Sequence, residues 1–279
     1  MSARFARHGV NGMRAMLVIA GLGMTLGGSA SAQRASSSDE WCQHEDWGDD
    51  RQGFCEVREY TVPAAGAVLT VDAAPNGGIQ VEGSPRGDIL VRARIVGTAR
   101  TEEDARAIVG QVQIVATADR VNADGPRGLG RREGWHVSYR LAVPTTTPLA
   151  LRTTNGGITV DSVDSKVELR TVNGGIKLSR MAGEVEGRTT NGGVDVELEG
   201  RTWQGTGLDV QTTNGGVKLE IPDGYSAHLE AGTTNGRVSV DFPVTVYGRM
   251  GRSLSSDIGG GGPTLRVQTS NGGIKISRK

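Results

Sequence analysis

The sequence has few aromatic residues, which make up 4% of the chain and exclude a large core built around aromatic rings. The inward positions must then be filled by Val, Ile and Leu, and this indicates a thin core. There are also only two cysteines and four histidines. No two histidines stand at the spacing of metal ligands, so we expect neither a metal site nor a bound cofactor.

Long hydrophobic runs are missing except for one near the N-terminus. Three arginines precede an uncharged stretch over residues 15–33, in which the small residues Ala30-Ser31-Ala32 stand near the end. A basic start, an apolar middle and an A-x-A end are typical of a secretory signal peptide, with cleavage after Ala32. An uncleaved membrane anchor is the alternative, although the run is only as long as the shortest spanning helices. We therefore expect residues 1–32 to be a signal peptide and the protein to be periplasmic, secreted or on the cell surface.

An excess of basic charge is also missing. Removal of residues 1–32 takes away three arginines and no acid, which leaves 28 basic against 31 acidic side chains. Proteins that bind nucleic acid show a strong basic excess, so we expect no nucleic acid partner. No second apolar stretch is long enough to span a bilayer, and we expect no membrane span in the mature chain.

Both cysteines lie shortly after the expected cleavage site, at Cys42 and Cys55. In an exported protein such a pair indicates one disulfide that closes a small loop, with a stabilisation of roughly 3 kcal/mol. A metal-bound pair is the weaker alternative, because no neighbouring Cys or His would complete four ligands. We expect residues 33–59 to form a flexible lead and a disulfide loop.

What the sequence contains in abundance is one short phrase, Asn-Gly-Gly or once Asn-Gly-Arg, followed by an aliphatic residue. Seven copies begin at Asn76, Asn155, Asn173, Asn191, Asn214, Asn235 and Asn271. On both sides of the phrase, apolar and polar residues alternate with a period of two. This pattern indicates two short strands per copy, each with one apolar face. We expect the glycines to supply a positive φ at the turn.

Two architectures fit the repeat. In a hairpin meander, each Asn-Gly joins antiparallel neighbours; in a β-solenoid, each coil of about 18 residues stacks on the next. The solenoid explains why a threonine stands two residues before the asparagine in six copies. Stacked Thr and Asn side chains can hydrogen-bond along columns at roughly 4.8 Å per coil. We therefore predict an all-β solenoid over residues 146–279, with loops near 200–208 and 247–263.

The segment before the regular array has a less regular pattern. Thr101 is a candidate helix N-cap, and the acidic residues that follow it favour the positive end of a helix dipole. Trp135 to Leu141 alternate between apolar and polar residues, as a half-buried strand does. We expect residues 60–145 to form a β-rich cap lobe with one short helix.

Three segments together resemble a known family: the lead from Cys55 to Tyr60, the Thr-Glu-Glu-Asp-Ala-Arg-Ala helix from Thr101, and the Arg-Thr-Thr-Asn-Gly-Gly-Ile coils. They are similar to the DUF4097 domain, a bacterial adhesin-like family with β-strand repeats, over residues 55–279. The resemblance implies an exported, right-handed β-helix-like fold with no established catalytic activity. The adhesin name is itself an analogy, so it adds only modest support for a binding function.

Charged residues recur at fixed distances before the turn asparagines. Five residues before them stand Glu168, Glu186, Asp209 and Glu230, and three residues before them stand Arg152, Arg170, Arg188 and Gln211. Both sets point outward on the same face, so acid and base can pair within and between coils. We favour a solvated charge ladder, with a few tenths of a kcal/mol per pair. The alternative is that Arg152, Arg170 and Arg188 form a surface strip that grips a sugar chain or another acidic polymer.

Two further segments invite a chemical interpretation and do not support it. Residues 224–228 place Ser226 and His228 in an arrangement like a nucleophile elbow, but the fifth residue is His rather than Gly. We expect this Ser and His in a turn between coils. The acidic residues of 44–50 lack the alternating order of a calcium loop. We therefore predict no catalytic residue.

These observations favour an exported, non-catalytic β-solenoid that acts at the cell envelope as a binding, adhesin-like or structural module. Its partner would be an envelope polysaccharide or another exported protein. One alternative is a polysaccharide lyase or hydrolase, which needs carboxylates, or an arginine and a base, that meet in one groove. Another is an envelope-stress sensor. We also expect the coil that ends at Lys279 to leave an exposed edge, which can pair with a second copy of the chain.

Overall fold

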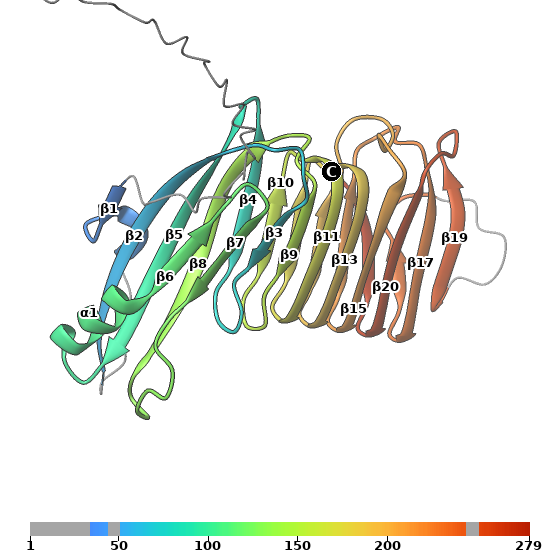
Figure 1. Ribbon diagram of the computed structural model, residues 1–279. Helices are drawn as coiled ribbons and strands as arrows, with labels where there is room; N and C mark the ends of the chain where they lie inside the picture. Colours follow the sequence, from blue (N-terminus) through green and yellow to red (C-terminus); the bar gives the residue numbers. More distant parts are fainter. Residues whose placement is uncertain (1–33, 44–50, 244–250) are drawn as a thin grey trace, which may run out of the picture.

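The computed structural model describes residues 34–43, 51–243 and 251–279. The expected signal peptide and the acidic segment 44–50 lie outside the described residues. The described chain forms two long β-sheets that face each other, with one α-helix at the N-terminal end (Figure 1). Among the described residues no helix is long and apolar enough to cross a bilayer.

Sheet A contains eleven of the described strands. In spatial order they are β1 (Arg34–Ser36), β2 (Gln52–Pro63), β5 (Asp88–Ala99), β8 (Gly134–Pro144), β4 (Ile79–Ser84), β10 (Ile158–Asp161), β12 (Ile176–Ser179), β14 (Val194–Glu197), β16 (Val217–Ile221), β21 (Ile274–Arg278) and β18 (Val238–Val240).

Sheet B contains ten of the described strands. In spatial order they are β6 (Gln113–Ala116), β7 (Arg120–Asp124), β3 (Leu69–Asp72), β9 (Leu149–Arg152), β11 (Asp164–Asn173), β13 (Ala182–Asn191), β15 (Gly207–Asn214), β20 (Thr264–Asn271), β17 (Ala227–Asn235) and β19 (Ser253–Ile258). Helix α1 (Glu102–Gln111) and a short 3-10 helix, η1 (Glu40–Cys42), complete the elements.

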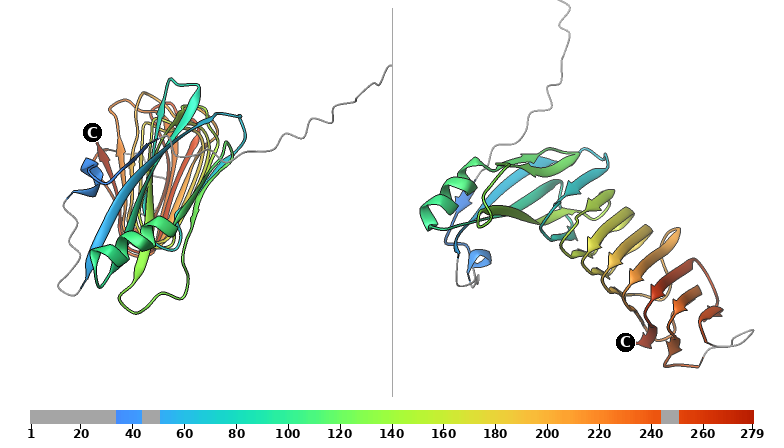
Figure 2. Two further views of the ribbon diagram at one scale, coloured as in Figure 1. Left: turned by 60° about the vertical axis from the view of Figure 1, so that its left-hand side comes forward. Right: turned by 90° about the horizontal axis from the view of Figure 1, so that it is seen from below.

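The repeats stack as a parallel solenoid, and the prediction of this fold is confirmed. Each coil consists of a sheet B strand, an asparagine turn and a sheet A strand. Neighbouring coils pair in register without a slip, so that Asn173 lies opposite Asn191 and Ile176 opposite Val194. Because the pairing is parallel, the turns are corners of a winding chain and not hairpin tips. Figure 2 shows the coils side by side, like slices in a row.

The array begins earlier than the sequence analysis predicts. Strands β3 and β4, on either side of Asn76, pair in parallel with β9 and β10 and form the first coil. Residues 88–144 then leave the array, build most of the N-terminal lobe, and return to the second coil. The predicted lead also differs, because Arg34–Ser36 pairs with β2 and residues 52–59 are already part of that strand.

The order of the coils in space differs from their order in the sequence. The last coil, β20 and β21, lies between the fifth coil (β15 and β16) and the sixth coil (β17 and β18). The expectation that the coil ending at Lys279 is the open edge is therefore wrong. The sixth coil is the terminal one, and β19 covers its sheet B strand by antiparallel pairing.

Side chains at the turns form two ladders along the solenoid. Each turn asparagine donates from Nδ2 to Oδ1 of the asparagine in the preceding coil, over 2.7–2.9 Å. The threonines do not bond to each other. Each of the six donates instead to a glycine carbonyl of the preceding coil, as Thr171 does to Gly156 over 2.9 Å. The threonine ladder satisfies buried hydroxyl groups, whereas the asparagine ladder is exposed.

The first glycine of each turn is required by close packing between coils. A Cβ on Gly174 would lie 1.9 Å from the carbonyl oxygen of Gly156, and the equivalent distance is 1.9–2.1 Å in the other coils after the first. Only Gly77 and Gly272 among these glycines have a positive φ, of 155° and 157°. The expected positive φ is therefore wrong for the other five turns.

The core between the sheets is thin and aliphatic, as the composition predicts. Inward residues such as Leu169, Ile176 and Leu178 are at most 1% exposed.

The N-terminal lobe is built differently. Helix α1 is capped by Thr101, whose side chain accepts a hydrogen bond from the Asp104 N–H, and Arg58 donates to the carbonyl oxygens of Val109 and Val112 at its end.

Candidate functional site

The candidate site lies on the outer face of sheet B, where alternate residues of each strand point away from the core. Because the coils pair in register, equivalent residues form straight rows across the sheet. The row three residues before the turn, which we call the Arg/Gln row, contains in spatial order Arg152, Arg170, Arg188, Gln211, Gln268 and Gly232. The row one residue before the turn, the hydroxyl row, contains in the same order Thr154, Val172, Thr190, Thr213, Ser270 and Thr234.

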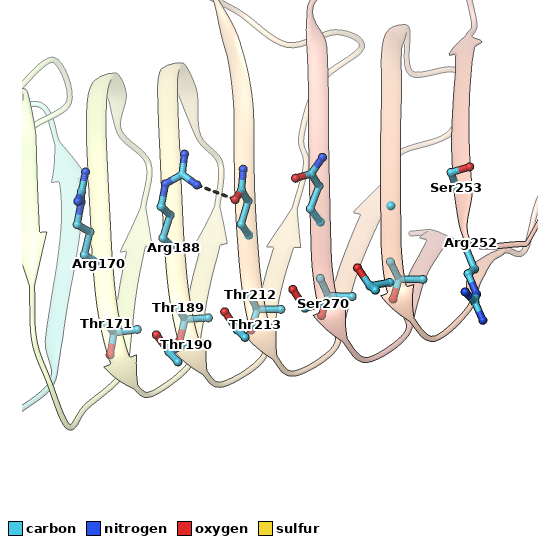
Figure 3. Close-up of a pocket in the computed structure, with 16 residues that line it drawn as sticks. Arg170, Thr171, Arg188, Thr189, Thr190, Thr212, Thr213, Arg252, Ser253 and Ser270 are labelled. Atoms are coloured by element: carbon cyan, nitrogen blue, oxygen red, sulfur yellow. Dashed lines mark hydrogen bonds between the residues drawn. The ribbon is translucent and has the colours of Figure 1, made fainter.

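A groove of about 700 Å³ follows these two rows from β11 to β19. Its outward-facing lining comes from Arg170, Arg188, Gln211, Gln268 and Gly232, from Thr190, Thr213, Ser270 and Thr234, and from Arg252 and Ser253. Figure 3 shows Arg170 and Arg188 at one end and Arg252 and Ser253 at the other, with the hydroxyl row near the turns. No carboxylate is among the lining residues. The described groove thus offers cations, amides and hydroxyls, and not the acid pair that a hydrolase needs.

The middle of the Arg/Gln row is held by hydrogen bonds. Arg188 donates from Nε to Glu186 over 2.7 Å and from Nη1 to the Gln211 amide oxygen over 2.6 Å. Gln211 in turn donates to Asp209 over 3.1 Å. These contacts fix both side chains in place and leave Arg188 partly neutralised.

Arg152 and Arg170 differ from Arg188. Within the described residues, neither guanidinium has a hydrogen bond or an ion pair with another side chain, although the two lie on paired strands at equivalent positions. Like charges directly across a strand pair are destabilising. Arg152 also lies opposite Asp72 of the first coil, so Arg170 is the more available of the two to an anion.

The acids beside them are paired with cations, but in the described chain only Glu186 pairs with an arginine of the expected row, Arg188. Arg266 binds Glu230 over 2.7 Å and lies 3.8 Å from Asp209, and Lys166 bonds to Glu184 over 3.2 Å. The bond from Glu184 and its charge raise the pKa of the Lys166 ammonium. The acids are therefore largely paired, whereas Arg152 and Arg170 have no ion pair within the described residues.

The sequence analysis missed half of the groove. Gln268 and Ser270 belong to the last coil, which the sequence order places at the far end rather than in the middle. Arg252 lies just before β19, a strand that carries no repeat phrase. One signal for the coil order exists, because Arg237 takes the place of the second glycine. At this position a Cβ faces the next coil at 3.2–3.5 Å from a glycine or Arg237 carbonyl, so a side chain fits best in the terminal coil.

A polar cluster on β17 and β19 involves His228, one of the two residues considered for nucleophilic chemistry. His228 Nδ1 lies 2.6 Å from Asp257, and Nε2 lies 3.4 Å from Ser255 Oγ and 3.6 Å from Glu230. Asp257 is 67% exposed, and Glu230 competes with Ser255 for the same imidazole nitrogen. Ser226 lies directly before β17, where it forms an isolated β-bridge with Thr202, and accepts a hydrogen bond from the Gly260 N–H. The cluster fastens β19 to β17, and the expected position of His228 in a turn is wrong.

The remaining residues considered in the sequence analysis lie outside the groove. Cys42 and Cys55 form the predicted disulfide, which joins η1 to β2. Burial lowers the pKa of His136 on β8, and the charge of Arg94 lowers it further. In residues 34–43, 51–243 and 251–279, no three His, Cys, Asp or Glu side chains lie together as metal ligands would.

The fold and the groove define a class of protein, a parallel two-sheet β-solenoid with a polar groove on the outer face of sheet B. The chain belongs to the family described as Toastrack DUF4097, which matches residues 107–277. No curated protein matches the chain.

Solved structures with a similar chain path come from three bacteria. A "putative cell adhesion protein" from Clostridium sporogenes is 13% identical with a TM-score of 0.44, over 80% of this chain and 99% of the other. A "putative adhesin" from Bacteroides fragilis is 12% identical with a TM-score of 0.37, over 81% and 97%. A "Putative lipid binding protein" from Parabacteroides distasonis is 9% identical with a TM-score of 0.36, over 80% and 96%.

Proposed function

We propose that this protein is an exported, non-catalytic binding module of the cell envelope, and that the sheet B groove binds a linear acidic polysaccharide. The observation that carries the proposal is the groove itself, in which arginines, amides and hydroxyls repeat in register along the solenoid axis. A polymer with regularly spaced groups can contact one coil after another in the same way.

The charges favour an acidic ligand. Arg170 has no acidic partner in the described chain, whereas Arg152 lies opposite Asp72 of the first coil. Guanidinium groups bind carboxylates through paired hydrogen bonds. The groove lining itself contributes no negative charge to oppose such a ligand.

The hydroxyl row favours a sugar over an acidic polypeptide. Thr190, Thr213, Ser270 and Thr234 each offer a hydroxyl that can donate and accept, on four successive coils of the groove. A polysaccharide carries hydroxyl groups along its whole length and can use this row, whereas a polypeptide of Asp and Glu offers mainly carboxylates.

Export supports the same proposal. The basic and apolar N-terminal stretch has the pattern of a signal peptide, and a disulfide persists in oxidising compartments such as the periplasm or the cell exterior. The Cys42–Cys55 bond fits that setting.

A binding experiment tests the function. We expect the protein to bind alginate, a linear polyuronate, more tightly than dextran, which is neutral, with an affinity that falls as salt is added. Arg170→Gln should weaken alginate binding by about tenfold, since charge-assisted hydrogen bonds contribute roughly 1.5–3 kcal/mol. Lys177→Gln is the matched control, because it removes a cation from the outer face of sheet A. Equal affinity for alginate and dextran, or equal effects of the two variants, would contradict the proposal.

A further inference from the structure

The Arg/Gln row is interrupted at one position. Five successive coils place Arg or Gln there, and the sixth places Gly232, in the middle of β17. A Cβ on this glycine would meet nothing within 4 Å, so the space above it is open. Packing does not require a glycine here, in contrast to the turn glycines. Glycine inside a strand weakens it and often marks a site where another molecule approaches the backbone.

The open space above Gly232 forms a notch in the floor of the groove, surrounded by polar side chains. They are Gln268 and Ser270 on β20, Thr234 on β17, and Arg252 and Ser253 at the edge formed by β19. None of these side chains has a hydrogen bond or an ion pair within the described part of the chain. Arg188 and Gln211, further along the groove, are by contrast tied to their neighbours. The notch is therefore where the groove offers the most unused donors and acceptors.

The notch also carries a positive charge. Glu230 lies two residues before Gly232 on the same face of β17, but Arg266 binds it over 2.7 Å. Arg252 has no such acidic partner within the described residues, and its guanidinium is left to act on a ligand.

We propose that the notch at Gly232 binds one acidic sugar ring of the polysaccharide and sets the register of the chain in the groove. This inference rests on the proposed function. The ring carboxylate pairs with Arg252, and the ring hydroxyls bond to Gln268, Ser270 and Thr234. The backbone at Gly232 lets the ring approach the floor of the sheet. The rest of the polymer extends along the hydroxyl row toward Arg188 and Arg170.

A larger side chain at Gly232 tests this site, because it fills the notch and should not disturb the fold. Gly232→Gln continues the row with the side chain that Gln211 and Gln268 already carry, on a strand where the added atoms meet open space. We expect alginate affinity, measured by calorimetry, to fall at least about tenfold, with a melting temperature equal to or above that of the wild type. Gly232→Ala should weaken binding less, because it fills less of the space.

A second variant tests the charge. Arg252→Gln should reduce alginate affinity by about tenfold and leave the weak dextran signal unchanged. Lys275→Gln removes a cation from the other sheet of the neighbouring coil and should leave alginate affinity unchanged.

The outcomes separate the two proposals. If the wild type binds no alginate, the proposed function fails. If the wild type binds alginate, Arg170→Gln weakens it and Gly232→Gln does not, the groove binds the polymer but the notch does not take a ring. If polyglutamate binds as tightly as alginate and is as sensitive to Gly232→Gln, the notch recognises carboxylates alone and the assignment to a sugar ring is overturned.

Discussion

The N-terminal lobe and the coil array share two continuous sheets but are held together in different ways. The lobe buries aromatic side chains such as Tyr60 on β2 and Tyr139 on β8. It also contains helix α1 and the Cys42–Cys55 disulfide. The array has mainly Val, Ile and Leu inside, with Trp203 and Tyr225 as its buried aromatic residues among those described, and its coils approach so closely that a Cβ at a turn glycine cannot fit. The lobe therefore depends on side-chain packing, and the array depends on backbone contact between neighbours.

This difference has a consequence for how a local change spreads. In the array each coil contacts mainly its neighbours, so the loss of one coil affects the next. In the lobe, contacts between distant segments such as Arg58 and the end of α1 join the parts into one unit.

The largest expected effect comes from deleting residues 264–279. Among the described strands, β17 and β18 pair with the rest of the array through β20 and β21, so the deletion should detach β17, β18 and β19 together. We expect residues 227–240 to lose hydrogen-exchange protection while the lobe keeps it. In a solenoid whose coils follow the sequence order, the same deletion would only remove the end. Retained protection over residues 227–240 would contradict the observed coil order.

A change from glycine to alanine should have opposite signs in the two regions. Gly174→Ala places a Cβ 1.9 Å from a carbonyl oxygen and should destabilise the protein by about 3 kcal/mol, at the upper end of overpacking effects. Gly110→Ala on α1 meets nothing within 4 Å and should stabilise the protein by about 0.5–1 kcal/mol. Denaturant unfolding of both variants measures the contrast. A stability change of the same sign in both would show that close backbone contact does not distinguish the array.

The sequence predicts much of the array because the repeat spacing alone fixes which residues occupy equivalent positions in successive coils. Residues that alternate around Asn173 or Asn191 have the same surroundings in every coil, so strand positions, inward faces and the Arg/Gln row all follow from one alignment. The spatial order of the coils does not follow, because equivalent units can stack in more than one order at similar energy. In the repeat phrases, the terminal coil differs from the others by Arg237, which replaces the second glycine. This difference indicates the end of the array only if it is known that the second glycine faces the next coil.

The site is predictable only in part for the same reason. Arg152, Arg170 and Arg188 are neighbours in both sequence and space, so the sequence places them correctly in one row. The notch brings Gly232 of the sixth coil beside Gln268 of the last coil and Arg252 of β19. No local pattern encodes that combination, since it depends on the inserted coil.

Loss of the disulfide should act on the lobe alone. The Cys42Ala/Cys55Ala double variant removes a cross-link that spans 13 residues and should destabilise the protein by about 2–3 kcal/mol by the loop-entropy argument. Hydrogen exchange should rise first in β2 and in residues 34–43, with β11 to β14 unchanged. The bond lies far along the sheets from the groove, so alginate binding should not change. An equal loss of protection in the array would mean that the two regions unfold as one unit.

The smallest expected effect tests the asparagine ladder. Asn173 donates to Asn155 over 2.7 Å and accepts from Asn191 over 2.8 Å, so Asn173→Ala removes two exposed hydrogen bonds and should lower stability by about 1–2 kcal/mol. Asn76, in the first coil, takes part in one bond of the ladder, so Asn76→Ala should lower stability by about half as much. Val172→Thr is the control, because it changes an exposed neighbour that is 43% accessible without touching the ladder. Urea unfolding that ranks the variants in this order would show that the array gains stability one coil at a time, whereas equal effects of Asn173→Ala and Val172→Thr would mean that backbone pairing alone holds the turns.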